Sequence, residues 1–210
     1  MFVKSGVDII EVGVPFTDPI AEGPIIQRAH DRAIKKQISL EDVFELIKKF
    51  RSQDEETPIV LMGYLNSFIF YKDLIEKNQN NSVDSILVVD IPGELDIADY
   101  GIKNENINTI SLISPTTKND RIKLIANNSS GFIYYVTLRG VTGSSNLDVD
   151  EIKKNISEIK KYATVPTLAG FGIKSPDDAK ALSSCADGVI IGSSIVKMIE
   201  ESSSTKEFDK

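Results

Sequence analysis

Two carboxylates near the start of the chain are the first candidates for chemistry. Glu11 lies inside the apolar, β-branched run of residues 9–14, and Glu22 lies on the loop that follows it. A carboxylate inside a buried strand lowers stability unless it is paired, protonated or used. One acid in a strand and a second on the next loop could work as an acid–base pair over a pocket. The alternative, a hydrogen-bonded Glu11 and a solvated Glu22, is the commoner outcome for an arbitrary sequence.

Composition excludes several other classes of function. The 210 residues carry a net charge of −7, so nothing favours nucleic acid or an anionic membrane as a partner. The apolar runs are all shorter than the roughly 20 residues that span a bilayer. The single Cys185 excludes an intramolecular disulfide and fits a reducing cytosol, most simply as a small buried residue. Since His30 is the only histidine, serine-protease-like chemistry and histidine-based metal sites are disfavoured, no metal is predicted, and we expect His30 on a helix face.

Apolar β-branched runs alternate with helical patterns along the chain and predict the elements that would position these acids. Strands are expected at residues 9–14, 58–63, 84–90, 108–114, 131–137, 165–170 and 187–192. Helices are expected at residues 24–35, 40–50, 68–77, 94–101, 118–127, 149–162, 175–182 and 193–201. Residues 1–6 resemble the last turn of a helix that stops at Gly6, and residues 202–210 form a polar tail. The absence of a linker or composition shift predicts one domain for residues 1–210.

The order of these elements predicts parallel βαβ units, for which an open doubly wound sheet and a (β/α)₈ barrel are both candidates. The placement of the glycines favours the barrel. Gly143, Gly170, Gly172 and Gly192 follow late strands, and Ser193 opens the last helix. In barrels the loops after the last strands often bind a phosphate group through free backbone N–H groups. No GxGxxG follows the first strand, which disfavours a dinucleotide fold; ordinary strand-to-helix turns are the alternative for these glycines.

Seven motifs, in one order and across nearly the whole chain, resemble those of the tryptophan synthase alpha subunit. They are EVGVPFTDPIAEGPIIQ (residues 11–27), LMGYLN (61–66), VVDIP (88–92), ISPTT (113–117), GFIYYVTLRGVTG (131–143), AGFGI (169–173) and ADGVIIGSSIV (186–196). The resemblance implies a TIM-type (β/α)₈ barrel, of which seven strands are apparent in this chain. It also implies a cytoplasmic carbon–carbon lyase of tryptophan biosynthesis that cleaves indole-3-glycerol phosphate to indole and glyceraldehyde 3-phosphate. The expected partner is a beta subunit that carries pyridoxal phosphate, in an alpha2beta2 complex, and no cofactor is expected in this chain.

The resemblance also assigns roles to individual residues. The catalytic group would comprise Glu11, Glu22 and Tyr134. The other expected sites are a phosphate cradle (Gly143, Phe171, Gly172, Gly192, Ser193), an indole pocket (Met62, Tyr64, Leu87), a closing loop (Thr142) and a loop facing the beta subunit (Asp18, Pro19). Asp90 matches a polar position at a strand end.

The sequence departs from the family pattern in three places. Glu22 replaces the commoner Asp, Leu138 aligns with an arginine of the closing loop beside Arg139, and the family's opening helix, first strand and first helix have no counterpart. These departures keep two further hypotheses open. One is a catalytically weak chain that docks on the beta subunit and activates it. The other is a different phosphate-binding barrel enzyme, such as a phosphosugar isomerase.

Overall fold

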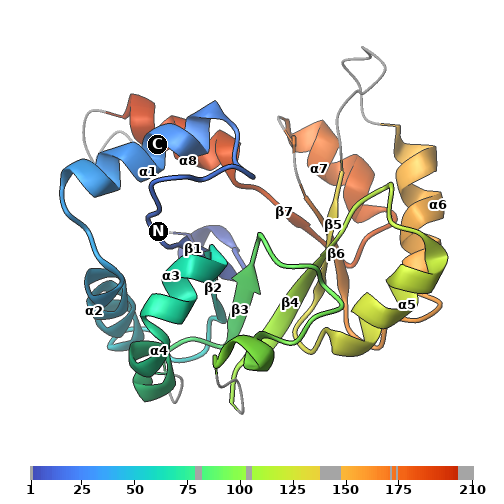
Figure 1. Cartoon of the computed structure of the whole chain (residues 1–210). Coiled ribbons are helices and arrows are strands. Elements are labelled where there is room, and N and C mark those ends of the chain that lie inside the picture. The colour runs from blue at the N-terminus through green and yellow to red at the C-terminus, as the bar shows by residue number, and fades with distance from the viewer. Residues whose placement is uncertain are drawn as a thin grey trace. The chain divides into compact units, whose positions relative to one another are not determined.

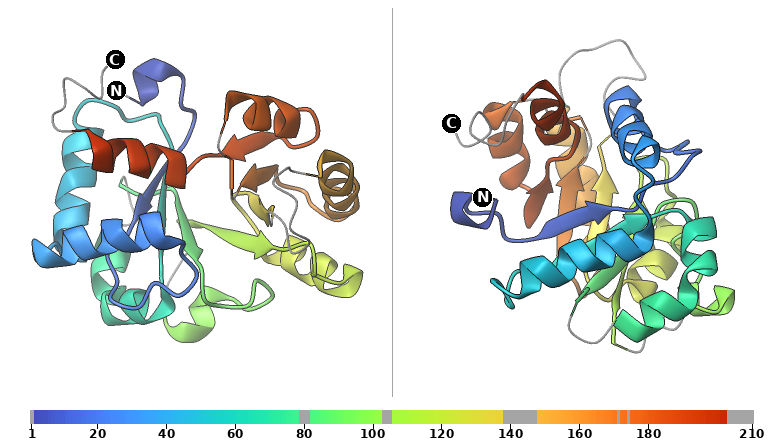
Figure 2. Two further views of the ribbon diagram at one scale, coloured as in Figure 1. Left: turned by 90° about the horizontal axis from the view of Figure 1, so that it is seen from above. Right: turned by 90° about the vertical axis from the view of Figure 1, so that its left-hand side faces the viewer.

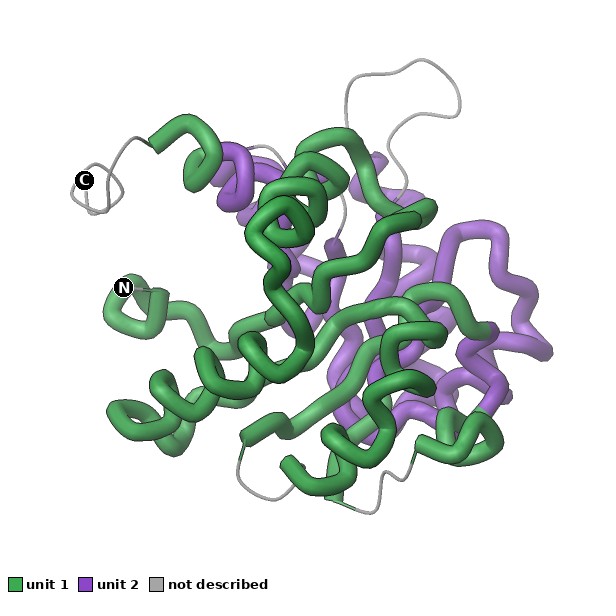
Figure 3. The backbone as a smooth tube through the Cα atoms, turned by 60° about the vertical axis from the view of Figure 1, so that its left-hand side comes forward, with its two compact units in different colours: residues 1–91, 96–109, 198–210 green, residues 92–95, 110–197 purple. Residues whose placement is uncertain are grey.

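The computed structural model describes residues 2–78, 82–102, 106–137, 148–170, 172–173 and 175–202 (Figure 1). Strands and helices alternate along the chain in these parts (Figure 1, Figure 2). The chain divides into two compact units, coloured separately in Figure 3. Unit 1 comprises residues 1–91, 96–109 and 198–210, and unit 2 comprises residues 92–95 and 110–197.

Unit 1 contains three parallel strands that pair in chain order. They are β1 (Ile10–Gly13), β2 (Ile59–Gly63) and β3 (Ser85–Val88). Its helices are α1 (Pro24–Lys35), α2 (Leu40–Arg51), α3 (Leu65–Phe70) and α4 (Lys72–Asn78), with 3₁₀ turns η1 (Val3–Ser5) and η2 (Ile97–Tyr100).

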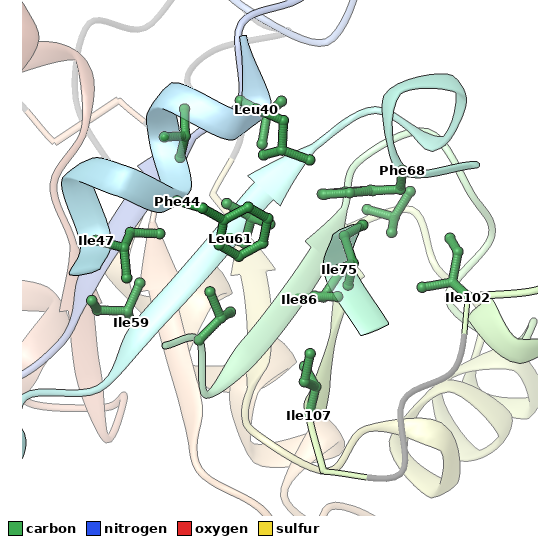
Figure 4. Close-up of a cluster of buried hydrophobic side chains, with 14 of the residues drawn as sticks. Leu40, Phe44, Ile47, Ile59, Leu61, Phe68, Ile75, Ile86, Ile102 and Ile107 are labelled. Atoms are coloured by element: carbon green, nitrogen blue, oxygen red, sulfur yellow. The ribbon is translucent and has the colours of Figure 1, made fainter. Parts of the chain in front are cut away.

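The core of unit 1 lies between one face of this sheet and its helices. Ile59 and Leu61 of β2 pack with Phe44 and Ile47 of α2, and all four side chains are buried (Figure 4). Helix α2 presents these residues at helical spacing after a capping box at Ser39, as the sequence predicts. Because side chains alternate along a strand, Val60 and Met62 of β2 face the other side of the sheet.

Arg51 ties together the N-terminal ends of β2 and β3. Its guanidinium donates to the carbonyl oxygens of Ser82 and Thr57 and to the Asp84 carboxylate, 2.7 Å away. Asp84 Oδ2 also accepts the Ile59 N–H at 2.7 Å. The Arg51 side chain is only 12% exposed, so this network binds strand starts that would otherwise leave buried polar groups unpaired.

Unit 2 repeats the same architecture with parallel strands in chain order. Its strands are the end of β4 (Asn108–Ile113), β5 (Ile133–Val136), β6 (Thr167–Gly170) and β7 (Gly188–Ile190). Its helices are α5 (Asn119–Asn128), α6 (Val149–Ile159), α7 (Pro176–Ser183) and the first part of α8 (Ser193–Glu201). A second buried cluster, which includes Ile125, Ile133, Ile156 and Leu182, packs β5 against these helices.

Each strand expected from the sequence is present within the described residues, and most helices begin and end within two residues of their expected bounds. The helix expected at residues 68–77 is wrong, because Tyr71 separates α3 from α4. Helix α3 begins earlier, at Leu65, whose N–H donates to Asp90 Oδ1 at 2.7 Å. A distant carboxylate thus satisfies the start of a helix that local sequence does not mark.

Two short segments are 3₁₀ turns. The helix expected at residues 94–101 is the turn η2, which begins after Asp96 and ends at Gly101 with a φ of 76°. The N-terminal turn η1 ends at Gly6 with a φ of 85°, so the expected glycine stop is confirmed. Residues 203–210 of the expected tail lie outside the described residues, and the single-domain expectation stays a prediction. Among the described helices, none is long and apolar enough to cross a membrane.

Candidate active site

Glu11 is a buried carboxyl group on β1. Its Oε1 is sealed from solvent and has no hydrogen-bond partner among the described residues. Burial, with a smaller contribution from the negative charge of Glu22, raises the pKa of Glu11 to about 7. A carboxyl group with this pKa is close to half protonated at neutral pH, so it is able both to donate and to accept a proton there.

Met62 and Leu87 extend from the same face of the sheet as Glu11. Glu11 pairs with Val60 of β2, and the next positions on that face pair Gly13 with Met62 and Met62 with Leu87. This is the face opposite the buried cluster of unit 1, since Ile59 and Leu61 fill the other side. The structure therefore brings one expected catalytic residue and two expected pocket residues onto one apolar surface.

Glu22 lies on the loop between β1 and α1, which we call the acid loop (residues 14–23). Its side chain is half-buried, and burial raises its pKa above the ordinary value. The negative charge of Glu22 is the second contribution, after burial, to the raised pKa of Glu11. Helix α1 starts directly after this loop because Pro24, at its first position, has a φ suited to a helix start and no N–H to leave unpaired.

Tyr64, just beyond β2, holds the acid loop. The buried Tyr64 ring stacks on Phe16 at a centroid distance of 4.8 Å, and its hydroxyl accepts the Ala21 N–H at 3.0 Å. Phe16 is fixed at a second point, because its N–H donates to Nδ1 of His30 at 3.0 Å. The Tyr64 that the sequence suggests for an indole pocket is therefore also an anchor of the loop that carries Glu22.

Tyr134 lies on β5 in unit 2 and is half-buried. Its ring passes directly over Gly170 of β6: a Cβ at position 170 would stand 2.7 Å from both Cε2 and the hydroxyl oxygen of Tyr134. Only glycine leaves room for the ring in this position. Gly170 is therefore a determinant of the Tyr134 orientation.

The expected phosphate-binding positions Gly172, Gly192 and Ser193 also lie in unit 2. Gly172 has a φ of 74°, which favours glycine, and the next residue is joined to α8 because Ser194 Oγ donates to the Ile173 carbonyl at 2.8 Å. The Gly192 carbonyl accepts the first hydrogen bond of α8, from Val196. The N–H groups that begin α8 are thus placed at the loop after β7, where a helix N-terminus favours an anion.

Several expected site residues lie outside the described residues: Gly143 and Phe171 of the phosphate cradle, and Thr142 of the closing loop. Asp18 and Pro19 lie at the outer turn of the acid loop, where the neighbouring Ile20 is 83% exposed. In the part of the chain that the structure describes, no three His, Cys, Asp or Glu side chains gather as they would around a metal ion. Cys185 is half-buried against the core of unit 2.

The sequence alone missed three contributors to this arrangement. The sequence predicts His30 only on a helix face, yet its ring accepts a hydrogen bond from the acid loop. It predicts Gly170 only as one of the late-strand glycines, and it assigns no role to Ser194. A sole histidine in the second turn of the helix after the acid loop is the signal that could have drawn attention to His30. The other two depend on packing between strands, which spacing does not reveal.

Parallel strands that alternate with helices, a carboxyl group buried on a strand, and a glycine just before a late helix are typical of (β/α)-barrel enzymes. Comparison with known proteins identifies one family: the family model "Tryptophan synthase alpha chain" matches residues 1–210. The chain belongs to the tryptophan synthase alpha chain family.

Individual relatives agree with this assignment. The chain is 46% identical over 201 residues to a tryptophan synthase alpha chain of Neisseria meningitidis serogroup B, covering 94% of this chain and 77% of that protein. It is 45% identical to one of Nitrosomonas europaea, covering 95% and 74%. The crystal structure of the alpha subunit from Legionella pneumophila str. Paris superposes with a TM-score of 0.81 at 36% identity, over 95% of this chain and 75% of that one. The expected TIM-barrel fold class is thereby confirmed.

Proposed function

We propose that this chain cleaves indole-3-glycerol phosphate to indole and glyceraldehyde 3-phosphate, with Glu11 as general acid and base. Membership in the tryptophan synthase alpha chain family supports the reaction, a carbon–carbon lyase step of tryptophan biosynthesis. The observation that carries the assignment of Glu11 is its buried carboxyl group, with a pKa of about 7 and one oxygen free of hydrogen bonds among the described residues.

The chemistry requires a proton transfer at each end of the bond that breaks: one group gains a proton and the other loses one. Indole leaves readily only after C3 of its ring is protonated, and the glycerol hydroxyl must lose a proton as its carbon becomes an aldehyde. Protonated Glu11 donates to C3, and the resulting carboxylate accepts the hydroxyl proton, so the residue returns to its starting state. A pKa near neutrality suits both transfers.

Glu22 is the second carboxylate of this proposal. Its position on the acid loop, coupled to Glu11, supports a role in stabilising the positive charge that develops on the indole N–H. Tyr134, oriented by Gly170, is the third catalytic side chain. Met62 and Leu87 supply the apolar surface beside Glu11 on which the indole ring would lie, and Tyr64 adds its ring at the loop.

The phosphate group is proposed to bind the N-terminus of α8 at Gly192 and Ser193, with Gly172 on the neighbouring loop. Gly143 and Phe171 complete this cradle, and Thr142 closes over it, on the resemblance alone. Binding of the phosphate lends remote binding energy that orients the reacting end of the substrate.

The proposed partner is a tryptophan synthase beta subunit, in an alpha2beta2 complex in the cytoplasm. A chain of a tryptophan synthase complex from Pyrococcus furiosus superposes on this one with a TM-score of 0.80 at 30% identity, over 96% of this chain and 82% of that one. The exposed Ile20 beside Asp18 and Pro19 supports the acid loop as the docking surface. Pyridoxal phosphate belongs to the partner in this proposal, and this chain needs no cofactor.

The test is indole release from indole-3-glycerol phosphate by the wild type, Glu11→Gln and Glu56→Gln, with and without a beta subunit. Glu56 is an exposed carboxylate outside the site and serves as the matched control. We expect kcat to fall about 100- to 10,000-fold in Glu11→Gln and to stay unchanged in Glu56→Gln. If Glu11→Gln keeps wild-type indole release, the assignment of Glu11 is wrong. If the wild type releases no indole but activates the beta subunit, the docking-partner hypothesis replaces the lyase.

A further inference from the structure

We propose that His30 is a positioning residue for Glu22: its neutral imidazole accepts the Phe16 N–H and thereby fixes the acid loop between β1 and α1. The proposal rests on the proposed catalytic role of Glu22. It concerns unit 1 alone, in which β1, the acid loop, α1 and Tyr64 all lie.

The geometry is a hydrogen bond from the loop to the helix that follows it. The Phe16 backbone nitrogen lies 3.0 Å from His30 Nδ1, a good distance for an N–H to nitrogen bond. His30 belongs to the second turn of α1, and its ring is half-buried. The bond therefore closes the loop on its own helix, whose first residue follows Glu22 by two positions.

This contact is one of several that hold the acid loop in place. The Phe16 ring stacks on Tyr64, and the Tyr64 hydroxyl accepts the Ala21 N–H. At the end of the loop, Gln27 Nε2 donates to the Glu22 carbonyl at 2.9 Å, and at its start the Val14 N–H donates to the Met62 carbonyl at 2.8 Å. Phe16 takes part in both the His30 bond and the stack, so the His30 bond also orients the ring that Tyr64 meets. Loss of the bond would free the start of the loop and, through the stack, loosen the segment that ends in Glu22.

The bond requires a particular state of the imidazole. Nδ1 accepts a hydrogen bond only when it carries a lone pair, so the ring is neutral and its proton lies on Nε2. Burial lowers the pKa of His30 and favours this state, whereas the negative charge of Asp31, the next residue of α1, acts in the opposite direction. The loop carries the carboxylates of Asp18 and Glu22. Protonation of His30 Nδ1 would place an N–H group opposite the Phe16 N–H, and the hydrogen bond would break.

Two substitutions separate the acceptor from the bulk of the ring. In His30→Asn, Oδ1 is bonded to Cγ as Nδ1 is, so it is an acceptor at the same reach. In His30→Gln the acceptor lies one bond further out, although glutamine is the better helix former of the two. His30→Leu removes the acceptor, and Lys35→Gln, at an exposed position of α1, is the control.

The direct test uses the fact that His30 is the only histidine. In a uniformly ¹⁵N-labelled full chain, the imidazole signals therefore belong to one ring. We expect the pattern of an Nε2–H tautomer and a nitrogen–nitrogen coupling across the hydrogen bond between the Phe16 amide and Nδ1, lost together as acid protonates the ring. An Nδ1–H tautomer, or no coupling at neutral pH, overturns the proposal.

The kinetic test measures kcat and KM for indole release at neutral pH. Since a misplacement of about 1 Å can lower a rate about 100-fold, we expect kcat to fall about 10- to 100-fold in His30→Leu and His30→Gln, with KM little changed. His30→Asn restores kcat and removes the His30 titration from the acid limb of the pH profile. An equal loss of kcat in His30→Asn, His30→Gln and His30→Leu would mean that the ring acts only by its packing, and it overturns the proposal. If Glu22→Gln retains full activity, the proposed catalytic role of Glu22 is wrong. This outcome is separate from the nitrogen–nitrogen coupling, which tests the hydrogen bond between Phe16 and His30 directly.

Discussion

Replacing Glu11 with glutamine should raise the stability of the folded chain at neutral and alkaline pH while it removes catalysis. Glutamine has nearly the shape of a protonated glutamic acid but never ionises. At neutral and alkaline pH the wild-type carboxyl group ionises in a buried place, which lowers the free energy of unfolding. Glutamine does not ionise, so the variant does not have this cost.

The magnitude follows from the pKa of Glu11, which burial raises from 4.5 to about 7. The folded state holds this proton more tightly than the unfolded state does, so wild-type stability declines as pH rises between these two values. Below pH 4.5 both states are protonated and the effect vanishes. Above pH 7 the gap between the two pKa values corresponds to roughly 3 kcal/mol, which Glu11→Gln recovers.

The assay is urea unfolding of the wild type, Glu11→Gln and Glu56→Gln at pH values from 4 to 8. We expect the curves of wild type and Glu11→Gln to meet at pH 4 and to separate by roughly 3 kcal/mol at pH 8, with Glu56→Gln following the wild type. A difference that does not depend on pH would refute the argument, because it would mean that the Glu11 carboxyl group does not titrate in a buried site.

Three further substitutions test other parts of the arrangement. Gly192→Ala should fold like the wild type, since its Cβ enters open space, but should raise KM and weaken binding of inorganic phosphate by calorimetry; unchanged phosphate affinity would argue against the cradle. Gly170→Ala should lower the free energy of unfolding by about 1 to 3 kcal/mol, because its Cβ meets Tyr134, and an unchanged urea midpoint would contradict that clash. Tyr64→Phe should increase hydrogen exchange at the Ala21 amide and lower stability by about 1 kcal/mol; continued protection of that amide would contradict the anchor.

The sequence predicts elements well where the signals are local. Helix α1 has its expected bounds because Pro24 suits a first helical position and the apolar spacing continues to Lys35. The burial of Glu11 is predictable too, since its strand neighbours are β-branched and apolar. The start of α3 is different: it depends on Asp90, 25 residues away along the chain, and no local pattern reports a contact of that range.

The candidate site divides in the same way. Residue types indicate an acid pair and an anion-binding helix start, because those chemistries need few kinds of side chain. The contacts that orient the acid loop and Tyr134 are not predictable from residue types. The bond from Phe16 to His30 and the passage of Tyr134 over Gly170 exist only once strands and helices are packed.

The Arg51 network has a practical consequence for protein engineering. It holds the starts of β2 and β3 through the Asp84 carboxylate and the carbonyl oxygens of Thr57 and Ser82, whereas Glu22 and the acid loop follow the far end of β1. The side chains that hold the strand starts are thus separate from those proposed for turnover in unit 1. Substitutions that stabilise the strand starts should raise the thermal stability of the chain without altering the residues proposed to contact the substrate.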